Sequence, residues 1–320
     1  MISTLLTRAF VLPAGFLLFC CVGSCRDMAQ RDDMKILAIW TQKGGVGKTA
    51  LACQLAHALR ARGQRVLVID LDSQGNAGAA LLRAEKAVAL AITAASLLMS
   101  GNLVVALPNL EFAVIRATTE LARVPEQPDE FSRFHANFQT NLASVAPAFD
   151  ICLIDCPPSD DLRVLLALTV ADFVLSPIQL NQEAIEGIAK TLRGTRGVER
   201  IREKFNPSLQ FLGIVPNMVE ATPLQKRNFV EVLENFGRYL VLDDRGNPLR
   251  ILRRSSIAEA QELGVALPEL GRTKTAAREA WAELSPTLDR IADLVMAAHS
   301  AAQFHSQLTH QLAAEVDHGA

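Results

Sequence analysis

The sequence lacks an excess of either charge, paired cysteines and a membrane-length hydrophobic run. Its 32 lysines and arginines face 34 aspartates and glutamates, and the formal net charge is −2. A chain so balanced has no general attraction for nucleic acid or anionic lipid, so any such contact needs a local basic patch. The apolar run at residues 10–22 is too short to span a bilayer. These absences favour a globular protein that buries one large core.

The cysteine positions argue against a disulfide-bonded protein and against a metal-cluster protein. Cysteine occupies positions 20, 21, 25, 53, 152 and 156, without paired metal-ligand spacing, and the last three positions lie in apolar stretches. We therefore interpret those three as small core residues of a protein in a reducing compartment, in preference to disulfides or a metal cluster.

The first 33 residues differ from the rest of the chain. They contain Arg8, an apolar run and "VGSC", which resembles a lipoprotein cleavage box ending at Cys25. A start assigned too early, with Met28 or Met34 as the true beginning, is the favoured interpretation, and an export or anchoring signal is the alternative. We expect an N-terminal extension at residues 1–33, one domain at residues 34–300 and a flexible tail at residues 301–320.

From Met34 onward, short apolar runs alternate with stretches of helical periodicity, which predicts an α/β fold. Strands are expected at residues 35–40, 64–72, 110–117, 149–155, 171–178 and 209–218, with a possible edge strand at 238–244. Helices are expected at residues 47–62, 84–99, 128–145, 160–170, 183–204, 222–236, 256–263 and 274–299. This order predicts a mostly parallel, twisted sheet with helices on both faces, in three α/β/α layers.

The stretch "TQKGGVGKT" predicts a phosphate-binding loop between the first strand and the first helix. It departs from G-x-x-x-x-G-K-[ST] because Gln42 stands at the first glycine position, and it carries a second lysine, Lys43. The glycines let successive backbone N–H groups point at one anion, and the following helix adds its positive dipole end. We expect Lys48 to reach the β- and γ-phosphates and the Thr49 hydroxyl to bind Mg²⁺. The predicted nucleotide-binding residues here are Gly44, Gly45, Val46, Gly47, Lys48, Thr49 and Ala50.

Carboxylates follow two of the expected strands. Asp70 and Asp72 end "VLVIDLD", and Asp155 ends "ICLID". If both strands run parallel to the first, these side chains lie near the loop, and a carboxylate buried there needs a cation. Asp155 is the expected Mg²⁺ partner in the manner of a Walker B aspartate, and Asp72 is expected to orient the attacking water. The alternative for Asp70 is a cap on the next helix.

These motifs resemble those of the ParA/MinD group of deviant Walker-A ATPases, and specifically the ParA partition proteins. The resemblance rests on "KGGVGKT", "VLVIDLDSQGNAG" and "FDICLIDCPPS", and extends through "ADFVLSPIQLNQEAIEGI", "LGIVPNM" and "RRSSIAEAQELGVAL". It is strongest for short plasmid ATPases of the IncC type. In this group the residue at Lys43 reaches the ATP of the other subunit in a nucleotide-sandwich dimer. The resemblance thus implies a P-loop fold, ATP and Mg²⁺ as cofactors, and Mg²⁺-dependent ATP hydrolysis by a homodimer.

The resemblance also implies roles for individual residues. Lys43, Lys48 and Asp72 are the catalytic residues, and the metal site comprises Thr49, Asp72 and Asp155. Asn217, in "VPNM", stands where the family often contacts adenine. Three departures, Ser73 for proline, Ala50 for threonine and Cys156 for threonine, remove no catalytic group.

The partners implied are non-specific DNA, bound in the ATP state, and a ParB-type centromere-binding protein that stimulates hydrolysis. The chain has no room before residue 35 for the helix-turn-helix domain of larger relatives, so sequence-specific repression is not expected. The candidate DNA contacts are Arg253 and Arg254, together with a second basic cluster. That cluster comprises Lys190, Arg193, Arg196, Arg200, Arg202 and Lys204, for which an ordinary solvated helix face is the alternative. A cytoplasmic, nucleoid-associated protein of plasmid or chromosome partition is expected.

Other functions on the same ATPase core stay open. A positioning ATPase for non-DNA cargo would carry the same motifs, and neighbouring genes would distinguish it from a partition protein. A MinD-like membrane-positioning ATPase is less favoured, because the helix expected at residues 274–299 carries Glu279, Glu283, Asp289 and Asp293 opposite its apolar side. No membrane contact is therefore expected.

Overall fold

The computed structural model describes residues 34–105, 107 and 110–317. Their core is one parallel sheet of seven strands in the order β3-β4-β2-β5-β1-β6-β7. The strands are β1 (Lys35–Ile39), β2 (Val66–Asp70), β3 (Val88–Thr93), β4 (Phe112–Arg116), β5 (Ile151–Asp155), β6 (Phe173–Ile178) and β7 (Gln210–Pro216). The predicted N-terminal extension at residues 1–33 lies outside the described residues.

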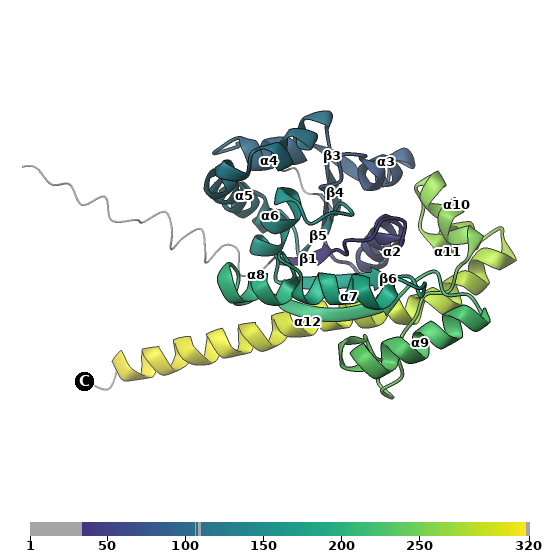
Figure 1. The fold of residues 1–320 in the computed structure, drawn as a ribbon. Coiled ribbons are helices and arrows are strands. Elements are labelled where there is room, and N and C mark those ends of the chain that lie inside the picture. The colour runs from purple at the N-terminus through teal and green to yellow at the C-terminus, as the bar shows by residue number, and fades with distance from the viewer. Residues whose placement is uncertain (1–33, 106, 108–109, 318–320) are drawn as a thin grey trace, which may run out of the picture.

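Helices cover both faces of the sheet, which gives the predicted three layers (Figure 1). One face packs against α4 (Ala94–Met99), α5 (Phe131–Val145), α6 (Leu162–Val170) and α8 (Val198–Lys204). The other packs against α2 (Lys48–Ala61), α3 (Asn76–Arg83), α10 (Ser255–Leu263), α11 (Leu267–Leu270) and α12 (Thr275–Asp317). A smaller apolar cluster joins α7 (Ala184–Arg193) and α9 (Pro223–Phe236) to β6 and β7. Short 3₁₀ turns occupy Thr119–Glu126, Pro128–Glu130, Ala146–Ala148 and Gly237–Tyr239.

Strand alternation explains why both faces are apolar. In β1, Ile36 and Ala38 join the cluster on the first face, and Leu37 and Ile39 join the cluster on the second. A strand buried on both faces reads as a continuous apolar run, so its position is easily read from sequence. The parallel arrangement also brings the carboxyl ends of β1, β2 and β5 together, because β5 pairs with both of the others.

The prediction of one helix at residues 84–99 was wrong, because Val88–Thr93 forms strand β3 at one edge of the sheet. This segment is rich in alanine, which favours helix, yet Leu90 and Ile92 are buried and Val88 and Ala91 are exposed. Only the period-2 burial, fixed by pairing with β4, selects the strand. The possible edge strand at residues 238–244 is absent from the described sheet, where this segment makes isolated bridges through Leu240 and Leu242.

The helix predicted at residues 183–204 is two helices, α7 and α8. The break is a turn in which Gly194 N–H donates to the Lys190 carbonyl and Gly197 N–H donates to the Gly194 carbonyl. Helix α3 was not predicted, and α12 continues through most of the segment expected to be a tail. Among the described residues, no helix combines the length and apolar character that crossing a membrane requires.

Candidate nucleotide-binding site

The phosphate loop connects β1 to α2, as the sequence predicts. Gly47 has φ +83° and precedes Lys48, the first residue of α2. A Cβ at Gly47 would lie 2.5 Å from the Asn217 Nδ2 atom, so both the backbone conformation and the available space require glycine. The Asn217 Nδ2 group donates to the Val46 carbonyl at 2.7 Å and holds this side of the loop in place.

Lys48 is turned into the loop. Its Nζ atom donates to the carbonyl of Lys43 at 3.0 Å and to that of Thr41 at 3.4 Å. The residue is only 7% exposed, and burial lowers the pKa of its ammonium group, an effect that nearby Asp155 opposes. An ammonium group held by carbonyls at the start of a helix is poised to exchange them for phosphate oxygens.

Thr49 and Asp155 meet at the first turn of α2. The Thr49 hydroxyl donates to Asp155 Oδ2 at 2.8 Å, and the other carboxylate oxygen of Asp155 is buried without a hydrogen-bond partner. Burial, helped by neighbouring Asp70, raises the pKa of Asp155 to about 8. A buried carboxylate with an unpaired oxygen beside a hydroxyl fits a divalent cation, which takes oxygen ligands.

The described residues contain no group of three or more His, Cys, Asp and Glu side chains able to hold a metal ion. A Mg²⁺ ion usually binds proteins through one or two carboxylates together with substrate phosphates and water. The donors present, Thr49 and Asp155, therefore fit a magnesium ion that arrives with a nucleotide.

Asp70 and Asp72 occupy different environments at the end of β2. Asp70 is fully buried opposite Asp155 and accepts hydrogen bonds from the N–H groups of Gly78, at 2.8 Å, and Asp72, at 3.2 Å. Burial raises its pKa to about 6, against the effect of these hydrogen bonds. Asp70 thus accepts a hydrogen bond from the first turn of α3. This agrees with the alternative role given to Asp70 from the sequence, a cap on the next helix. Asp72 is partly exposed, and its Oδ1 accepts the N–H of Gln74 at 3.0 Å.

Lys43 leaves the loop in another direction and forms an ion pair with Glu183, just before α7. This contact lowers the pKa of Glu183. Sequence reasoning assigned no role to Glu183, although it lies in the stretch "ADFVLSPIQLNQEAIEGI" that carries part of the resemblance. It also missed Gln179, whose Nε2 donates to the Gly45 carbonyl at 3.3 Å. Gln179 directly follows β6, which lies next to β1 in the sheet. Polar residues at the carboxyl ends of parallel strands lie near the ligand site, and this rule, which identified Asp155, also applies to Gln179.

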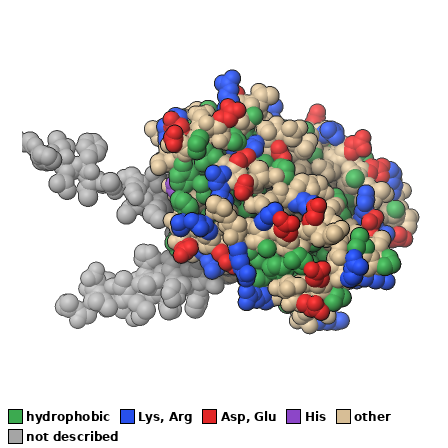
Figure 2. Space-filling model, viewed as in Figure 1, with side chains coloured by type: hydrophobic (Ala, Val, Ile, Leu, Met, Phe, Trp, Pro, Cys, Tyr) green, Lys and Arg blue, Asp and Glu red, His purple; other side chains and the backbone are tan. Residues whose placement is uncertain are grey.

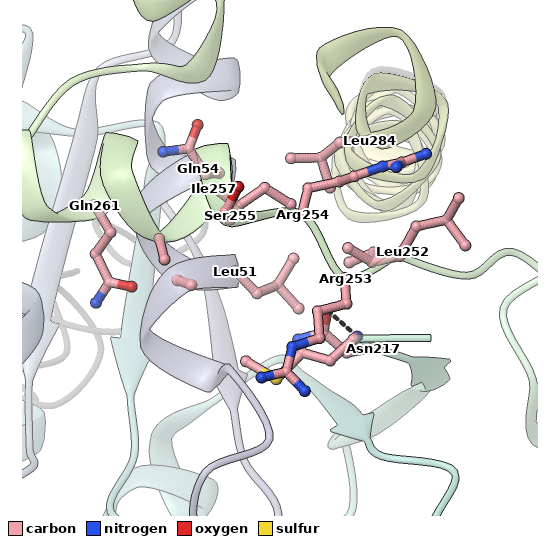
Figure 3. Close-up of a pocket in the computed structure, with 14 residues that line it drawn as sticks. Leu51, Gln54, Asn217, Leu252, Arg253, Arg254, Ser255, Ile257, Gln261 and Leu284 are labelled. Carbon is pink, nitrogen blue, oxygen red and sulfur yellow. Dashed lines mark hydrogen bonds between the residues drawn. The ribbon is translucent and has the colours of Figure 1, made fainter. Parts of the chain in front are cut away.

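A cavity of about 390 Å³ opens beside the start of α2 (Figure 3). It brings together Ala50 and Asn217, both predicted for nucleotide binding, with Arg253 and Arg254, both predicted for DNA binding. The complete lining is Ala50, Leu51, Gln54, Asn217, Met218, Ile251, Leu252, Arg253, Arg254, Ser255, Ile257, Ala258, Gln261 and Leu284. Arg253 and Arg254 therefore lie at a candidate ligand cavity. Each also forms an ion pair with a glutamate. Arg253 Nη1 lies 3.6 Å from Glu220 Oε1, and Arg254 binds Glu283 through Nε at 2.7 Å and Nη2 at 2.5 Å.

The second basic cluster divides into paired and unpaired residues. Lys190 pairs with Glu186, Arg193 pairs with Glu199, and Arg196 Nη1 donates to the Asp160 carbonyl at 2.6 Å. The remaining members are exposed and have no carboxylate in contact within the described part of the chain; they are Arg200, Arg202 and Lys204. Figure 2 shows lysine and arginine side chains gathered where α8 lies in Figure 1. This part of the cluster is the most available for an anionic partner.

Comparison with known proteins places this chain in a family. Residues 34–211 match the model of an AAA domain family, AAA_31. Protein IncC of Escherichia coli is 35% identical over 268 residues, covering 81% of this chain and 69% of that protein. The chromosome partitioning protein ParA of Caulobacter vibrioides (strain NA1000 / CB15N) is 32% identical over 238 residues, covering 72% and 85% of the two chains.

The chain belongs to the ParA family of partition ATPases. A solved structure with a similar fold is cobyrinic acid a,c-diamide synthase from Mycobacterium smegmatis with bound ATP analogue and magnesium. It has a TM-score of 0.57 and 26% identity, over 75% of this chain and 96% of that one. The family membership and the seven-stranded parallel sheet confirm the predicted ParA resemblance and the predicted P-loop fold.

Proposed function

We propose that this ParA-family chain is a Mg²⁺-dependent ATPase that dimerises when it binds ATP, and that it drives plasmid or chromosome partition through nucleotide-switched binding to non-specific DNA. The observation that supports this most directly is the division between the two lysines of the loop. Lys48 turns inward onto the loop carbonyls, while Lys43 turns away to Glu183. A lysine directed away from its own phosphate site can serve a second one once it leaves its carboxylate partner.

In this proposal Lys48 and the N–H groups of the loop bind the β- and γ-phosphates. Thr49 and Asp155 hold Mg²⁺, which neutralises charge on the phosphate oxygens when bound. Asp72, partly exposed beside these groups, orients the attacking water, and Asn217 and Ala50 contact the nucleoside. Lys43 reaches the ATP of the partner subunit in the dimer, which requires that it leave Glu183.

For DNA binding we propose that the basic residues of α8 contribute more than Arg253 and Arg254, which line the cavity. Arg200, Arg202 and Lys204 are exposed and unpaired in the described residues, whereas Arg254 is held by two hydrogen bonds to Glu283. A paired arginine must lose its carboxylate before it binds a phosphate, so it gains less. Arg253, whose ion pair is longer, stays a candidate contact. A ParB-type centromere-binding protein is the proposed partner that stimulates hydrolysis on the nucleoid.

The deciding experiment is retention of the full chain on non-specific duplex DNA. Wild type is compared with ATP and with ADP, and Lys43→Ala is compared in ATP, each at low and high salt. We expect retention only for wild type in ATP and a steep loss with salt. ATP binding without DNA retention under any condition would instead favour the alternative, a positioning ATPase for non-DNA cargo.

A second experiment assigns the DNA contacts. Replacement of Arg200, Arg202 and Lys204 by alanine is expected to weaken retention uniformly across DNA sequences and to reduce the salt slope by about one per lost phosphate contact. The matched control replaces three engaged residues, Lys190, Arg193 and Arg196, and is expected to have a smaller effect, because Glu186, Glu199 and the Asp160 carbonyl already hold them. Equal effects of the two sets would remove the distinction between paired and unpaired residues.

A further inference from the structure

Trp40 joins the phosphate loop to the segment that follows β5. Its indole ring is fully buried, and the Nε1–H group donates to the Ser159 carbonyl at 2.8 Å. The two residues are 119 positions apart, but they lie just beyond the ends of β1 and β5, which pair in parallel. A buried indole needs a partner for its N–H group, so this hydrogen bond fixes one segment against the other.

The segment at residues 157–160 takes its position from contacts of this kind. Its first two residues are prolines, which carry no N–H group and cannot donate to a neighbouring backbone. Just before them, the Cys156 N–H donates to the Ile39 carbonyl at 3.3 Å. Together with the bond from Trp40 to Ser159, this attaches the chain that leaves Asp155 to the end of β1 at two points.

The same segment contacts the phosphate loop on both sides of Lys43. Gln42, the residue before Lys43, donates through Nε2 to Asp160 Oδ2 at 3.4 Å. Gly44, the residue after it, lies against Pro158, since a Cβ at Gly44 would be 3.7 Å from the Pro158 Cβ atom. The position of residues 158–160 therefore sets the position of the Lys43 backbone.

We propose that Trp40 is a positioning residue that acts through residues 158–160 and holds Lys43 in the direction needed to reach the ATP of the partner subunit. This inference rests on the proposed function, since it assumes that Lys43 serves the partner's ATP. Lys48 and Thr49 begin α2, so the helix places them for the subunit's own nucleotide. Trp40 therefore affects turnover, which depends on the alignment of Lys43, and leaves ATP binding unchanged.

One test removes the N–H group of Trp40 and keeps the shape of the ring. The chain has two tryptophans, so in Trp281→Phe a tryptophan analogue enters at position 40 alone. In benzothienylalanine, sulfur replaces the indole N–H. We expect kcat for ATP to fall about 3- to 10-fold, the effect of one hydrogen bond, while the Kd for ATP with Mg²⁺ stays within about twofold. Trp281→Phe with ordinary tryptophan is the matched control and should behave as wild type, and an unchanged kcat in the analogue protein would overturn the proposal.

A second test asks whether the loss arises in the partner's site. Thr49→Ala is expected to be inactive in its own site but keeps Trp40 and Lys43, so an excess of it at saturating ATP offers an intact Lys43 to other subunits. The analogue protein and Lys43→Ala are each mixed with this excess. We expect turnover per analogue subunit to return to about the wild-type value, and Lys43→Ala to recover as well, because its partner now supplies the lysine. A purely structural defect in the analogue protein would not be restored.

The outcomes separate this inference from the function on which it rests. Wild type without ATP hydrolysis, or Lys43→Ala that stays inactive in the mixture, would contradict the proposed function. Recovery of Lys43→Ala without recovery of the analogue protein would overturn the role of Trp40 and leave the proposed function intact.

Discussion

The Thr49 hydroxyl donates a hydrogen bond of 2.8 Å to Asp155, which joins the first turn of α2 to the end of β5. The two residues are 106 positions apart in the sequence, and the parallel pairing of β1 with β5 brings them together. Because Asp155 keeps one buried oxygen without a partner, the pair is an incomplete set of oxygen donors. The strand pairing thus creates the pair of oxygen donors that we propose to hold Mg²⁺.

Removal of the Thr49 hydroxyl should separate metal-dependent from metal-independent binding. We expect Thr49→Ala to lose about 10- to 100-fold in ATP affinity when Mg²⁺ is present, because a ligand to a charged group disappears. With EDTA the variant and wild type should bind ATP alike. Thr49→Ser keeps the hydroxyl and is expected to retain most of the metal effect. Titration calorimetry with and without Mg²⁺ measures both, and an equal loss in EDTA would contradict the metal role.

The Lys43–Glu183 ion pair should oppose dimerisation. If Lys43 must leave Glu183 to reach the partner's ATP, Glu183→Gln removes a competitor, and an exposed pair of this kind is worth about 1.5- to 5-fold in an equilibrium constant. Half-maximal dimer formation, followed by analytical ultracentrifugation, should then need less ATP. Glu186→Gln breaks the neighbouring pair with Lys190 on α7 and is the matched control. An equal shift in the two variants would indicate a general charge effect.

Gly47 should tolerate no side chain. Gly47→Ala places a Cβ in a left-handed conformation and 2.5 Å from Asn217 Nδ2. Gly63→Ala shares the positive φ, +81°, but has no neighbouring atom within 4 Å. We expect the control to lower the free energy of unfolding by about 1–2 kcal/mol from backbone strain, and Gly47→Ala to lower it further and abolish ATP binding. Urea unfolding and ATP titration check both, and equal stability of the two variants would argue against the contact with Asn217.

His57 should make the protein less stable in mild acid. The residue is buried against the edge of Phe112, and burial lowers its pKa from 6.5 to about 4. The unfolded chain therefore binds a proton between these values while the folded chain does not, so stability is present above pH 6.5 and falls as the pH drops toward 4. Between pH 7.5 and 5 this amounts to about 2 kcal/mol in the free energy of unfolding.

The variant His57→Leu should lose this part of the pH dependence, whatever its stability at neutral pH. Urea unfolding of wild type and variant at several pH values gives the difference in slope. The other titrating groups are common to both proteins, so they cancel in the comparison. Parallel stability curves from pH 7.5 to 5 would show that His57 titrates normally in the folded state.

The sequence by itself determined the central strands of the sheet and the position of the candidate phosphate loop. Strands β1, β2 and β5 are buried on both faces, so their apolar runs are continuous, and Asp155 and Asp70 stand where those runs end. The loop glycines and Lys48-Thr49 likewise follow from local chemistry, because a helix start and successive N–H groups bind an anion wherever they occur.

Only the tertiary structure decided which side chains face this site from distant segments. Residues 88–93 became a strand because an edge position paired them with β4, against the helical preference of alanine. Glu183 met Lys43, and Gln261 reached the cavity, through the packing of α7 and α10 around the loop and α2. No local pattern marks such contacts, because they depend on how separate helices cover one sheet and not on the residues beside them in the chain.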